Sequence, residues 1–449
     1  MKYAFALQIL VIVTFLSAES LSASGTAGES LNAPACDSSG TTYEVNDIDG
    51  LYAAVNLSDY QANPWPIFVR PGTYVLSAND PAGNPRANRG RLELQPGMAL
   101  CGTVGDRTAA VIDASGLPAS SYGGAVPNTG AIRLGNGDNS LEWLTVRNAI
   151  AGGAGIIVHL NGSGVTNVRI AHVASTGSQR GVDIRNLGSS PDGNIINADL
   201  MDNDLHGNRI STAQGMRIIN TQGSSTSAVN VKLRRNRFYD NAQGLVVENL
   251  GGTTLGKIIV NSNHDRFYEN GGGAFIGAAF GPANNNTVMF TAVDSVFENN
   301  NGPTNLARGG LTVAGAANVN APASGSNNTA EVVLRNCSFA NNQVADLAAY
   351  GAASIPSTLG LSATNNSAIV SLYNTQVPNL VTANSNPAFP EGMNFVTIYS
   401  PTAGRLDATP ATIDKLPLAL ASAFVLRIVG PDGSGVPGSH RNKRPASEF

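Results

Sequence analysis

Residues 230–249 have the sequence NVKLRRNRFYDNAQGLVVEN, and they align without gaps with residues 167–186, NVRIAHVASTGSQRGVDIRN. Both stretches contain a short alternation of apolar and polar residues, a polar corner, a glycine and a second alternation. An alternation with period two is typical of β-strands, whose successive side chains point to opposite faces. The repeated unit therefore consists of two strands joined by a corner rich in Asn and Gly.

Two columns of this repeat recur along the chain. The first column, set on Phe238, is occupied by Ser175, Leu205, Phe238, Phe267, Phe297 and Phe339, at spacings of 30, 33, 29, 30 and 42 residues. The second column lies three residues further on and holds Ser178, Asn208, Asn241, Asn270, Asn300 and Asn342. Asn is favoured in corners with left-handed backbone, so we expect this column to form a ladder there.

The repeat indicates a solenoid. A unit of about 30 residues cannot bury its own apolar face, whereas stacked units share one continuous core. The absence of helical segments between copies excludes βαβ units. A β-sandwich is the competing fold, but it would not place the same residue types at the same offset six times. We therefore predict an all-β protein, a right-handed parallel β-helix with strands about 4.8 Å apart.

The composition agrees with a turn-rich all-β chain. Charged residues make up 13% of the 449 residues, about half of the roughly 25% that is usual, and 50 residues are Gly. A hydrophobic content of 42% is enough for a large core and excludes wholesale disorder. The net charge of −4 is too small to indicate binding to nucleic acid or to a membrane surface, so we expect no nucleic-acid partner.

The N-terminus has the features of a secretory signal: Lys2, an apolar run over residues 4–16, and small residues up to Ser24. The run is shorter than the ~18–20 residues that span a membrane, which makes an anchor the weaker alternative. We expect a secreted monomer, extracellular, periplasmic or at the cell surface, with no membrane span after signal removal. The expected organisation is a signal peptide (1–24), an N-terminal linker (25–40), an N-terminal cap with the first coils (41–116), β-helix repeats (117–380), a C-terminal cap (381–429) and a disordered tail (430–449).

The three cysteines cannot all pair within one chain. An exported compartment permits a Cys36–Cys101 disulfide but does not require it, so both states are open. Cys337 is expected to be a free thiol, because stacking places it many coils from either partner and beyond the ~7 Å Cα limit for bridging.

The segment before the repeats adds a resemblance to a known superfamily. Residues 49–55 indicate a short amphipathic helix, and IFVRPGTYV (67–75), LELQPGMALCG (92–102) and VIDASG (111–116) follow it. Together with the repeats, they resemble the pectate-lyase-like right-handed parallel β-helix superfamily over roughly residues 41–380. The resemblance implies a short N-terminal helix that caps the solenoid and hides its first strand edges.

The resemblance implies little about function, because this fold hosts lyases, hydrolases, epimerases, phage tailspikes and inert adhesins. The chain contains neither the Asp-Asp pair nor the Gly-His-Gly sequence of the polygalacturonase type. It also does not match the arginine-centred motif of the best-known pectate lyases. Any site must therefore be sought in the repeat itself.

Charged residues gather on the second strand of the repeat. Counting from the glycine of each copy, the first and third positions are apolar and point inward, so the second and fourth point outward. The outward positions hold His159, Asp183, Arg185, Arg217 and Glu248 beside the apolar Ile157, Ile219 and Val246, with Arg180 at the edge. Neighbouring rungs would place His159 over Arg185 and Asp183 beside Arg217, each about 5 Å apart.

This set of residues suits an acidic sugar polymer. Arginine forks bind carboxylates in a bidentate manner, and by neutralising a uronate they make its C5 proton removable. His159, with a reference pKa near ~6.5, could take that proton or pass one to the leaving oxygen. We assign His159, Asp183, Arg185 and Arg217 as catalytic candidates and Arg180 and Glu248 as substrate-binding candidates. The alternative is a solvated strand face, on which opposite charges pair for ~0.2–1 kcal/mol.

Two further groups are weaker candidates. Asp199, Asp202, Asp204 and His206 could supply paired carboxylates for glycoside hydrolysis or bind Ca²⁺ through oxygen ligands, although Asp is also an ordinary corner residue. Tyr239 and Tyr268 follow the anchor Phe on neighbouring coils and could stack on sugar rings as substrate-binding residues; a plain exterior aromatic ladder is the alternative. His172 and His264 have no partner that the sequence indicates.

Two function classes follow from these observations. The first is a secreted β-helix protein directed at polysaccharide, a lyase or hydrolase of an acidic glycan. The second is a non-catalytic solenoid of the surface, adhesin or glycan-binding type. The sequence alone leaves open whether the protein is an enzyme.

Overall fold

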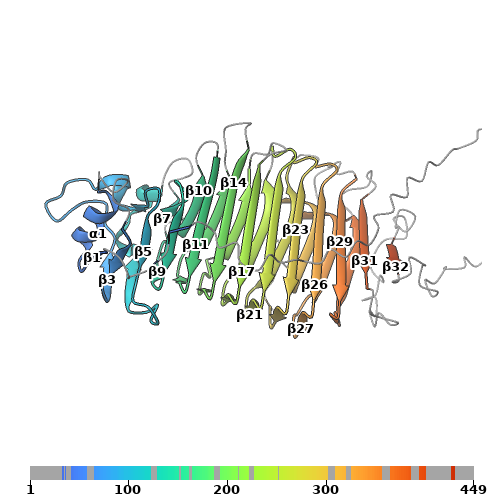
Figure 1. Cartoon of the computed structure of the whole chain (residues 1–449). Helices are drawn as coiled ribbons and strands as arrows, with labels where there is room; N and C mark the ends of the chain where they lie inside the picture. The colour runs from blue at the N-terminus through green and yellow to red at the C-terminus, as the bar shows by residue number, and fades with distance from the viewer. Residues whose placement is uncertain are drawn as a thin grey trace, which may run out of the picture.

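The computed structural model is a right-handed parallel β-helix in which three long parallel sheets run side by side along the solenoid axis (Figure 1). The structure describes residues 33–34, 36, 42–57, 65–122, 129–150, 153–160, 164–186, 193–210, 212–221, 227–250, 252–301, 309–319, 325–355, 365–385, 394–400 and 426–429. The predicted signal peptide and the predicted C-terminal tail lie outside these residues. Among the described residues, no helix is long and apolar enough to cross a membrane.

Each sheet takes one strand from each coil. The 13-stranded sheet contains β1 (Tyr43–Val45), β2 (Ile67–Val69), β5 (Ala99–Cys101), β8 (Asn139–Glu142), β11 (Gly164–Ala171), β14 (Asn194–Met201), β17 (Ala228–Arg234), β20 (Lys257–Asn263), β23 (Thr287–Val293), β26 (Thr329–Arg335), β29 (Ser367–Tyr373), β31 (Phe395–Tyr399) and β32 (Leu426–Val429). The ten-stranded sheet contains β4 (Leu92–Glu93), β7 (Gly130–Leu134), β10 (Ala154–Leu160), β13 (Arg180–Asn186), β16 (Gln214–Asn220), β19 (Gln243–Leu250), β22 (Gly272–Phe280), β25 (Gly309–Val319), β28 (Leu347–Ile355) and β30 (Leu380–Ser385). The nine-stranded sheet contains β3 (Gly72–Val75), β6 (Ala110–Asp113), β9 (Thr145–Arg147), β12 (Ala174–Thr176), β15 (Asp204–His206), β18 (Arg237–Tyr239), β21 (Arg266–Tyr268), β24 (Val296–Glu298) and β27 (Ser338–Ala340).

A coil contains three strands rather than the predicted two, for example β14, β15 and β16. The additional strand is the three-residue segment around the anchor column, such as Arg237–Tyr239. Three residues are too few to show an alternation, which is why the sequence pattern did not reveal it. The stacked strands also continue through β30 and β31, past the predicted end of the repeats at residue 380.

The anchor column forms the centre of the core. Register pairs Leu205 with Phe238, Phe238 with Phe267, Phe267 with Phe297 and Phe297 with Phe339, as predicted. The four phenylalanine rings stack with centroids 4.7, 4.8 and 4.9 Å apart. Consecutive rungs therefore share one apolar interior, and a single buried cluster reaches from Val45 to Ile398.

The predicted Asn column is a hydrogen-bonded ladder. The amide groups of Asn208, Asn241, Asn270 and Asn300 each donate to the Oδ1 of the next member, at 2.8–3.1 Å. Asn241 Nδ2 also donates to the carbonyl of Leu205, 2.9 Å away, so the ladder satisfies buried backbone as well. One detail of the prediction was wrong: the left-handed corner residue precedes the ladder, as in Asp240 (φ 57°) and Glu269 (φ 55°).

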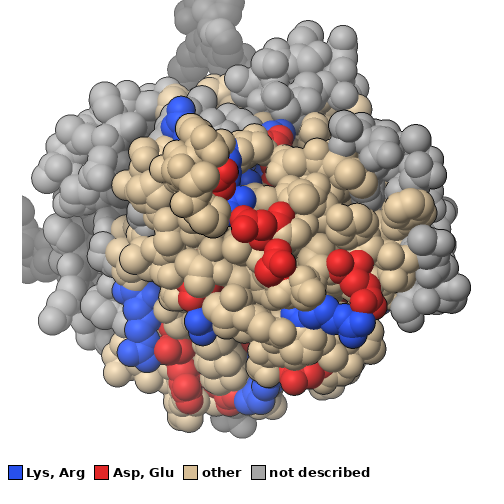
Figure 2. All heavy atoms as spheres, turned by 90° about the vertical axis from the view of Figure 1, so that its left-hand side faces the viewer, with Lys and Arg blue, Asp and Glu red and all other residues tan. Residues whose placement is uncertain are grey.

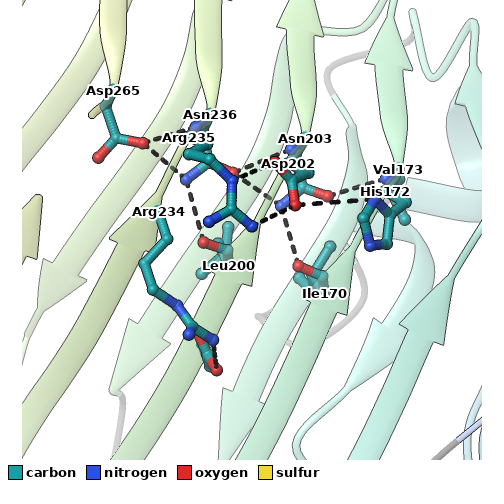
Figure 3. Close-up of polar contacts among 11 residues, drawn as sticks. Ile170, His172, Val173, Leu200, Asp202, Asn203, Arg234, Arg235, Asn236 and Asp265 are labelled. Carbon is teal, nitrogen blue, oxygen red and sulfur yellow. Dashed lines mark hydrogen bonds and ion pairs between the residues drawn. The ribbon is translucent and has the colours of Figure 1, made fainter. Parts of the chain in front are cut away.

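A second ladder lies at the corner between the 13-stranded and nine-stranded sheets (Figure 3). Asn203 Nδ2 donates to Asn236 Oδ1 and Asn236 Nδ2 donates to Asp265 Oδ1, both at 2.9 Å. Next to it in the picture, Arg235 binds Asp202 through two hydrogen bonds of 2.8 and 2.7 Å, and His172 Nδ1 lies 3.9 Å from Asp202 Oδ2.

His172 and His264 thus have neighbours that the sequence did not indicate. The ring of His172 stacks on Trp143 with centroids 3.8 Å apart, and His264 Nε2 lies 3.7 Å from Asp294 Oδ2. Both contacts join successive members of one exterior corner column, in which every residue has positive φ. This column holds Trp143, His172, Asp202, Arg235, His264 and Asp294.

Asp265 takes a position that Asn holds in the two preceding coils, and it makes the stability of the fold depend on pH. Burial raises the pKa of Asp265 to about 6, although Ser262 and Asn236 donate hydrogen bonds to its carboxylate. The unfolded value is about 3.9. The contribution of protonated Asp265 to the stability of the fold is therefore fully present below about pH 4. It is lost as the pH rises through about 6.

We expect the variant Asp265→Asn to be more stable than the wild type at pH 7.5 by about 1–3 kcal/mol, because an amide carries no charge to bury. The gain should shrink at pH 4.5, where the wild-type side chain is protonated. Urea denaturation of both proteins at the two pH values measures this difference. A gain of equal size at both values would contradict the prediction.

The N-terminal end is capped as predicted. Helix α1 (Ile48–Val55) begins at Asp47, whose side chain accepts a hydrogen bond from the Gly50 amide at 2.6 Å, and it buries Leu51 and Tyr52 against the first coil. Figure 2 shows this end, where acidic and basic side chains lie beside one another. Arg86 pairs there with Asp49, and Arg70 pairs with Glu44.

The structure shows the pairing of Cys36 and Cys101, which the sequence left open. Cys36 and Cys101 form a disulfide, with Cα atoms 5.8 Å apart, and it ties the N-terminal segment to β5. Cys337 is free and buried, as predicted.

Candidate functional site

The candidate residues lie on the outer face of the ten-stranded sheet, in the register that the sequence predicted. His159 pairs with Arg185 across β10 and β13, and Asp183 pairs with Arg217 across β13 and β16. Their neighbours Val182 and Ile184 point the other way and are fully buried in the core. Alternation along each strand and parallel stacking therefore bring these side chains together.

The alternative of a solvated strand face was wrong. Asp183 is 0% exposed, His159 2%, Glu248 4% and Arg185 8%. Period-two alternation distinguishes the inside of the solenoid from the outside, but it does not report whether the outside is open to solvent. Arg185 and Arg217 pair with a fully buried carboxylate, so alanine at either position is expected to destabilise the fold.

Three arginines converge on one carboxylate. Asp183 Oδ2 lies 2.6 Å from Arg185 Nη2, 3.1 Å from Arg217 Nη2 and 3.7 Å from Arg180 Nε. Burial acts to raise the pKa of Asp183, but the guanidiniums of Arg217, Arg185 and Arg180 outweigh it and hold that pKa well below its ordinary range. Asp183 is therefore a fixed anion that orders the arginines.

The same face continues toward the N-terminus with residues that the sequence did not reveal. Arg133 on β7 pairs with Glu93 on β4, and both strands belong to the ten-stranded sheet. Arg91, just before β4, is 3% exposed, and burial lowers its pKa. These residues precede the first glycine-anchored copy of the repeat, so no column pointed to them.

We call this set of side chains the arginine band: Arg91, Glu93, Arg133, His159, Arg180, Asp183, Arg185, Arg217 and Glu248. It extends over β4, β7, β10, β13, β16 and β19, or five strand spacings, about 24 Å along the axis. The band contains five arginines and three carboxyl groups. It therefore carries a surplus of positive charge, and burying such a surplus is costly unless an anion balances it.

The arginine band contains buried polar atoms without hydrogen-bond partners, among them Arg133 Nε. His159 Nδ1 and Glu248 Oε2 are buried and have no hydrogen-bond partner. Burial lowers the pKa of His159 to about 4, with Arg133 and Arg185 adding to the effect, so the imidazole is neutral at physiological pH. Burial raises the pKa of Glu248 to about 7, against the opposing effect of Arg217 and Arg180.

The tyrosines form an exterior ladder. The rings of His206, Tyr239 and Tyr268 stack with centroids 4.7 and 5.0 Å apart, so both faces of Tyr239 are covered. Arg266 lies over the Tyr268 ring, 5.0 Å from its centroid. A pyranose ring therefore finds no free face on Tyr239, and the geometry favours the alternative of a plain aromatic ladder.

The acidic segment is not brought together. Asp199 pairs with Arg234, Asp202 with Arg235, and Asp204 with both Arg107 and Arg237. Asp199 lies on the 13-stranded sheet, Asp204 on the nine-stranded sheet, and Asp202 at the corner between them. In the part of the chain that the structure describes, no three His, Cys, Asp or Glu side chains are grouped so that they could hold a metal ion.

Neither a protein-family profile nor a characterised protein sequence matches the chain. Among solved structures, it is similar to the A-module of the mannuronan C-5 epimerase AlgE6 of Azotobacter vinelandii, with 16% identity, a TM-score of 0.40, and coverage of 80% of this chain and 91% of that chain. It is also similar to the endo-xylogalacturonan hydrolase of Aspergillus tubingensis, with 10% identity, a TM-score of 0.33, and coverage of 89% and 98%. A third similar structure is a PL6 alginate lyase in complex with a trisaccharide, with 11% identity, a TM-score of 0.30, and coverage of 88% and 97%.

Proposed function

We propose that this chain is a secreted β-helix protein that acts on an acidic polysaccharide, which it binds along the arginine band. One observation carries the proposal: three arginines, whose side chains are 10–15% exposed, share the single carboxylate of Asp183, at 2.6, 3.1 and 3.7 Å. A uronate carboxylate would balance the remaining positive charge, and guanidiniums match its geometry. The length of the band, about 24 Å from β4 to β19, suits a polymer lying parallel to the axis.

The reaction that fits the band best is β-elimination. A uronate held between Arg133 and Arg185 would have its carboxylate charge neutralised, which acidifies the C5 proton. Neutral His159 would accept that proton as a general base. The C5–H electrons would form the C4–C5 double bond, the C4–O bond would break, and the departing glycosidic oxygen would take a proton from water.

Hydrolysis by a pair of carboxyl groups fits less well. Such a mechanism needs one carboxyl group that is protonated and one that is free. Asp183 is bound by three arginines, which hold its pKa low, so it can neither donate a proton nor approach a sugar as a nucleophile. Glu248 lies two rungs away, roughly 10 Å along the axis.

A non-catalytic glycan-binding or structural solenoid is the second candidate, and the burial of the band favours it. Asp183 and Arg185 are no more than 8% exposed, which is typical of an ion-pair network that holds a fold together. A panel of acidic and neutral glycans separates the candidates. Absorbance at 235 nm detects unsaturated uronides, new reducing ends without that absorbance detect hydrolysis, and binding without either signal indicates the non-catalytic protein.

On a polyuronate that the protein cleaves, we expect His159→Gln to lower the elimination rate by at least about 100-fold, since a general base contributes roughly 10²–10⁴-fold. Binding should change little, because glutamine keeps the size and polarity of the side chain. His264→Gln is the matched control, as His264 lies on the exterior corner column and its side chain is 59% exposed. Full activity of the His159 variant would exclude His159 as the base.

A further inference from the structure

Glu248 is a buried carboxyl group, and no arginine among the described residues lies within ion-pair distance of it. It is 4% exposed, and its Oε2 has no hydrogen-bond partner. The two guanidinium groups that act on Glu248 bind other side chains. Arg217 Nη2 binds Asp183 Oδ2 at 3.1 Å, and Arg180 Nε binds Gln214 Oε1 at 3.2 Å. Within the described ranges, Glu248 therefore forms no ion pair, although it stands beside a positively charged cluster.

The elements around Glu248 supply few charges. In register, its neighbours are Ile219 on β16 and Gly277 on β22, both uncharged. A Cβ at Gly277 would come within 2.6 Å of the Phe275 ring, so that ring fills the adjacent space. The charged groups that act on Glu248 are Arg217 on β16, and Arg180 and Asp183 on β13. Glu248 thus combines uncharged register neighbours with one orphaned carboxyl oxygen, and the charged groups that act on it all belong to the arginine band.

We propose that Glu248 binds the acidic glycan as a neutral carboxylic acid, whose O–H group donates a hydrogen bond to a carboxylate oxygen of a bound uronate. This inference rests on the proposed function and adds to it a residue that selects for acidic sugars. An ionised Glu248 would repel the uronate, whereas the acid form supplies the partner that Oε2 lacks. Burial, which raises the pKa of Glu248 to about 7, makes the acid form accessible near neutral pH.

Binding of the uronate is then coupled to uptake of a proton from solvent. Below pH 7 the side chain already carries that proton, and the affinity should be constant. Above pH 7 each pH unit should weaken binding by up to about tenfold, since one proton must be taken up for each ligand bound. His159, with a pKa of about 4, does not titrate in this range in the free protein.

The experiment is titration calorimetry of the full chain with a purified uronate oligosaccharide at pH 6 and pH 8, in two buffers of different ionisation enthalpy. We expect close to one proton taken up at pH 8 and little at pH 6. Glu248→Gln keeps a hydrogen-bond donor without a titratable proton, so it should bind equally at both pH values and take up none. Glu331→Gln, the same change at a half-buried position on β26, should behave as the wild type.

The outcomes separate this inference from the function on which it rests. Uronate binding with no proton uptake and equal affinity at both pH values overturns the role of Glu248 and leaves the proposed function standing. Proton uptake that persists in Glu248→Gln assigns the proton to another group and also overturns it. Binding to neutral glycans alone, or to no glycan, would overturn both the role of Glu248 and the proposed function. If Glu248→Gln does not fold, calorimetry of the wild type still shows whether uronate binding is coupled to proton uptake.

Discussion

Replacement of Phe267 by alanine is expected to lower the free energy of unfolding by about 3–5 kcal/mol, the range for a fully buried aromatic side chain in a core that cannot collapse around the gap. Phe267 lies between Phe238 and Phe297, with ring centroids 4.7 and 4.8 Å away, and it is 0% exposed. Its neighbours are held in register by strands β18 and β24. They cannot close a cavity without breaking ladder hydrogen bonds.

Chemical denaturation followed by circular dichroism measures this loss. The matched control is Phe395→Ala, because Phe395 points away from the core on β31 and is only half-buried. We expect that control to lose about 1 kcal/mol or less, as is typical of positions without core packing. A loss below about 1 kcal/mol for Phe267→Ala would mean that the stacked rings do not form the centre of a cooperative core.

Asp183→Asn is expected to destabilise the protein by about 3–5 kcal/mol, because it removes the buried carboxylate that Arg180, Arg185 and Arg217 share. The amide is isosteric, so packing is conserved and only the charge is lost. Arg185 and Arg217 would then face each other with side chains only 10% and 13% exposed and with no carboxylate between them. Raising the salt concentration should recover little, since buried charges are weakly screened.

Asp49→Asn is the control for this change, because Asp49 pairs with Arg86 through a side chain that is 58% exposed. Exposed pairs contribute about 0–1 kcal/mol, so this variant should stay close to the wild type. The double variant Asp183→Asn with Arg217→Gln should regain part of the loss, since it removes one unbalanced charge. Equal stability of Asp183→Asn and the wild type would show that the arginine band is hydrated rather than buried.

The sequence predicted the parts of the fold that depend on side-chain period. Phe238 and Phe267 fall in one column, and Asn241 and Asn270 in another, because each coil must repeat the geometry of the one before it. The same logic paired His159 with Arg185 and Asp183 with Arg217 in the correct register.

The features that the sequence could not predict depend on contacts that do not follow the repeat. Arg133 and Glu93 belong to the arginine band, but the rungs that carry them lack the glycine by which the repeat is aligned. The burial of Asp183 depends on what lies over the outer face of the sheet, which alternation along a strand does not encode. For Tyr239, the column predicted neighbouring rings, and only the structure shows that they leave neither of its faces free.

The uneven length of the coils has a consequence for how this chain can change. From Phe297 to Phe339 the spacing is 42 residues, 12 more than the 30 between Phe267 and Phe297, yet both pairs keep the same register. The additional residues thus lie between strands and do not displace a rung. The entropic cost of closing a loop rises only slowly with its length. One residue inserted within a strand would instead turn a row of core side chains outward. We therefore expect insertions and tags to be tolerated in the connections between β24 and β25 and between β25 and β26, outside the corners that the ladders occupy.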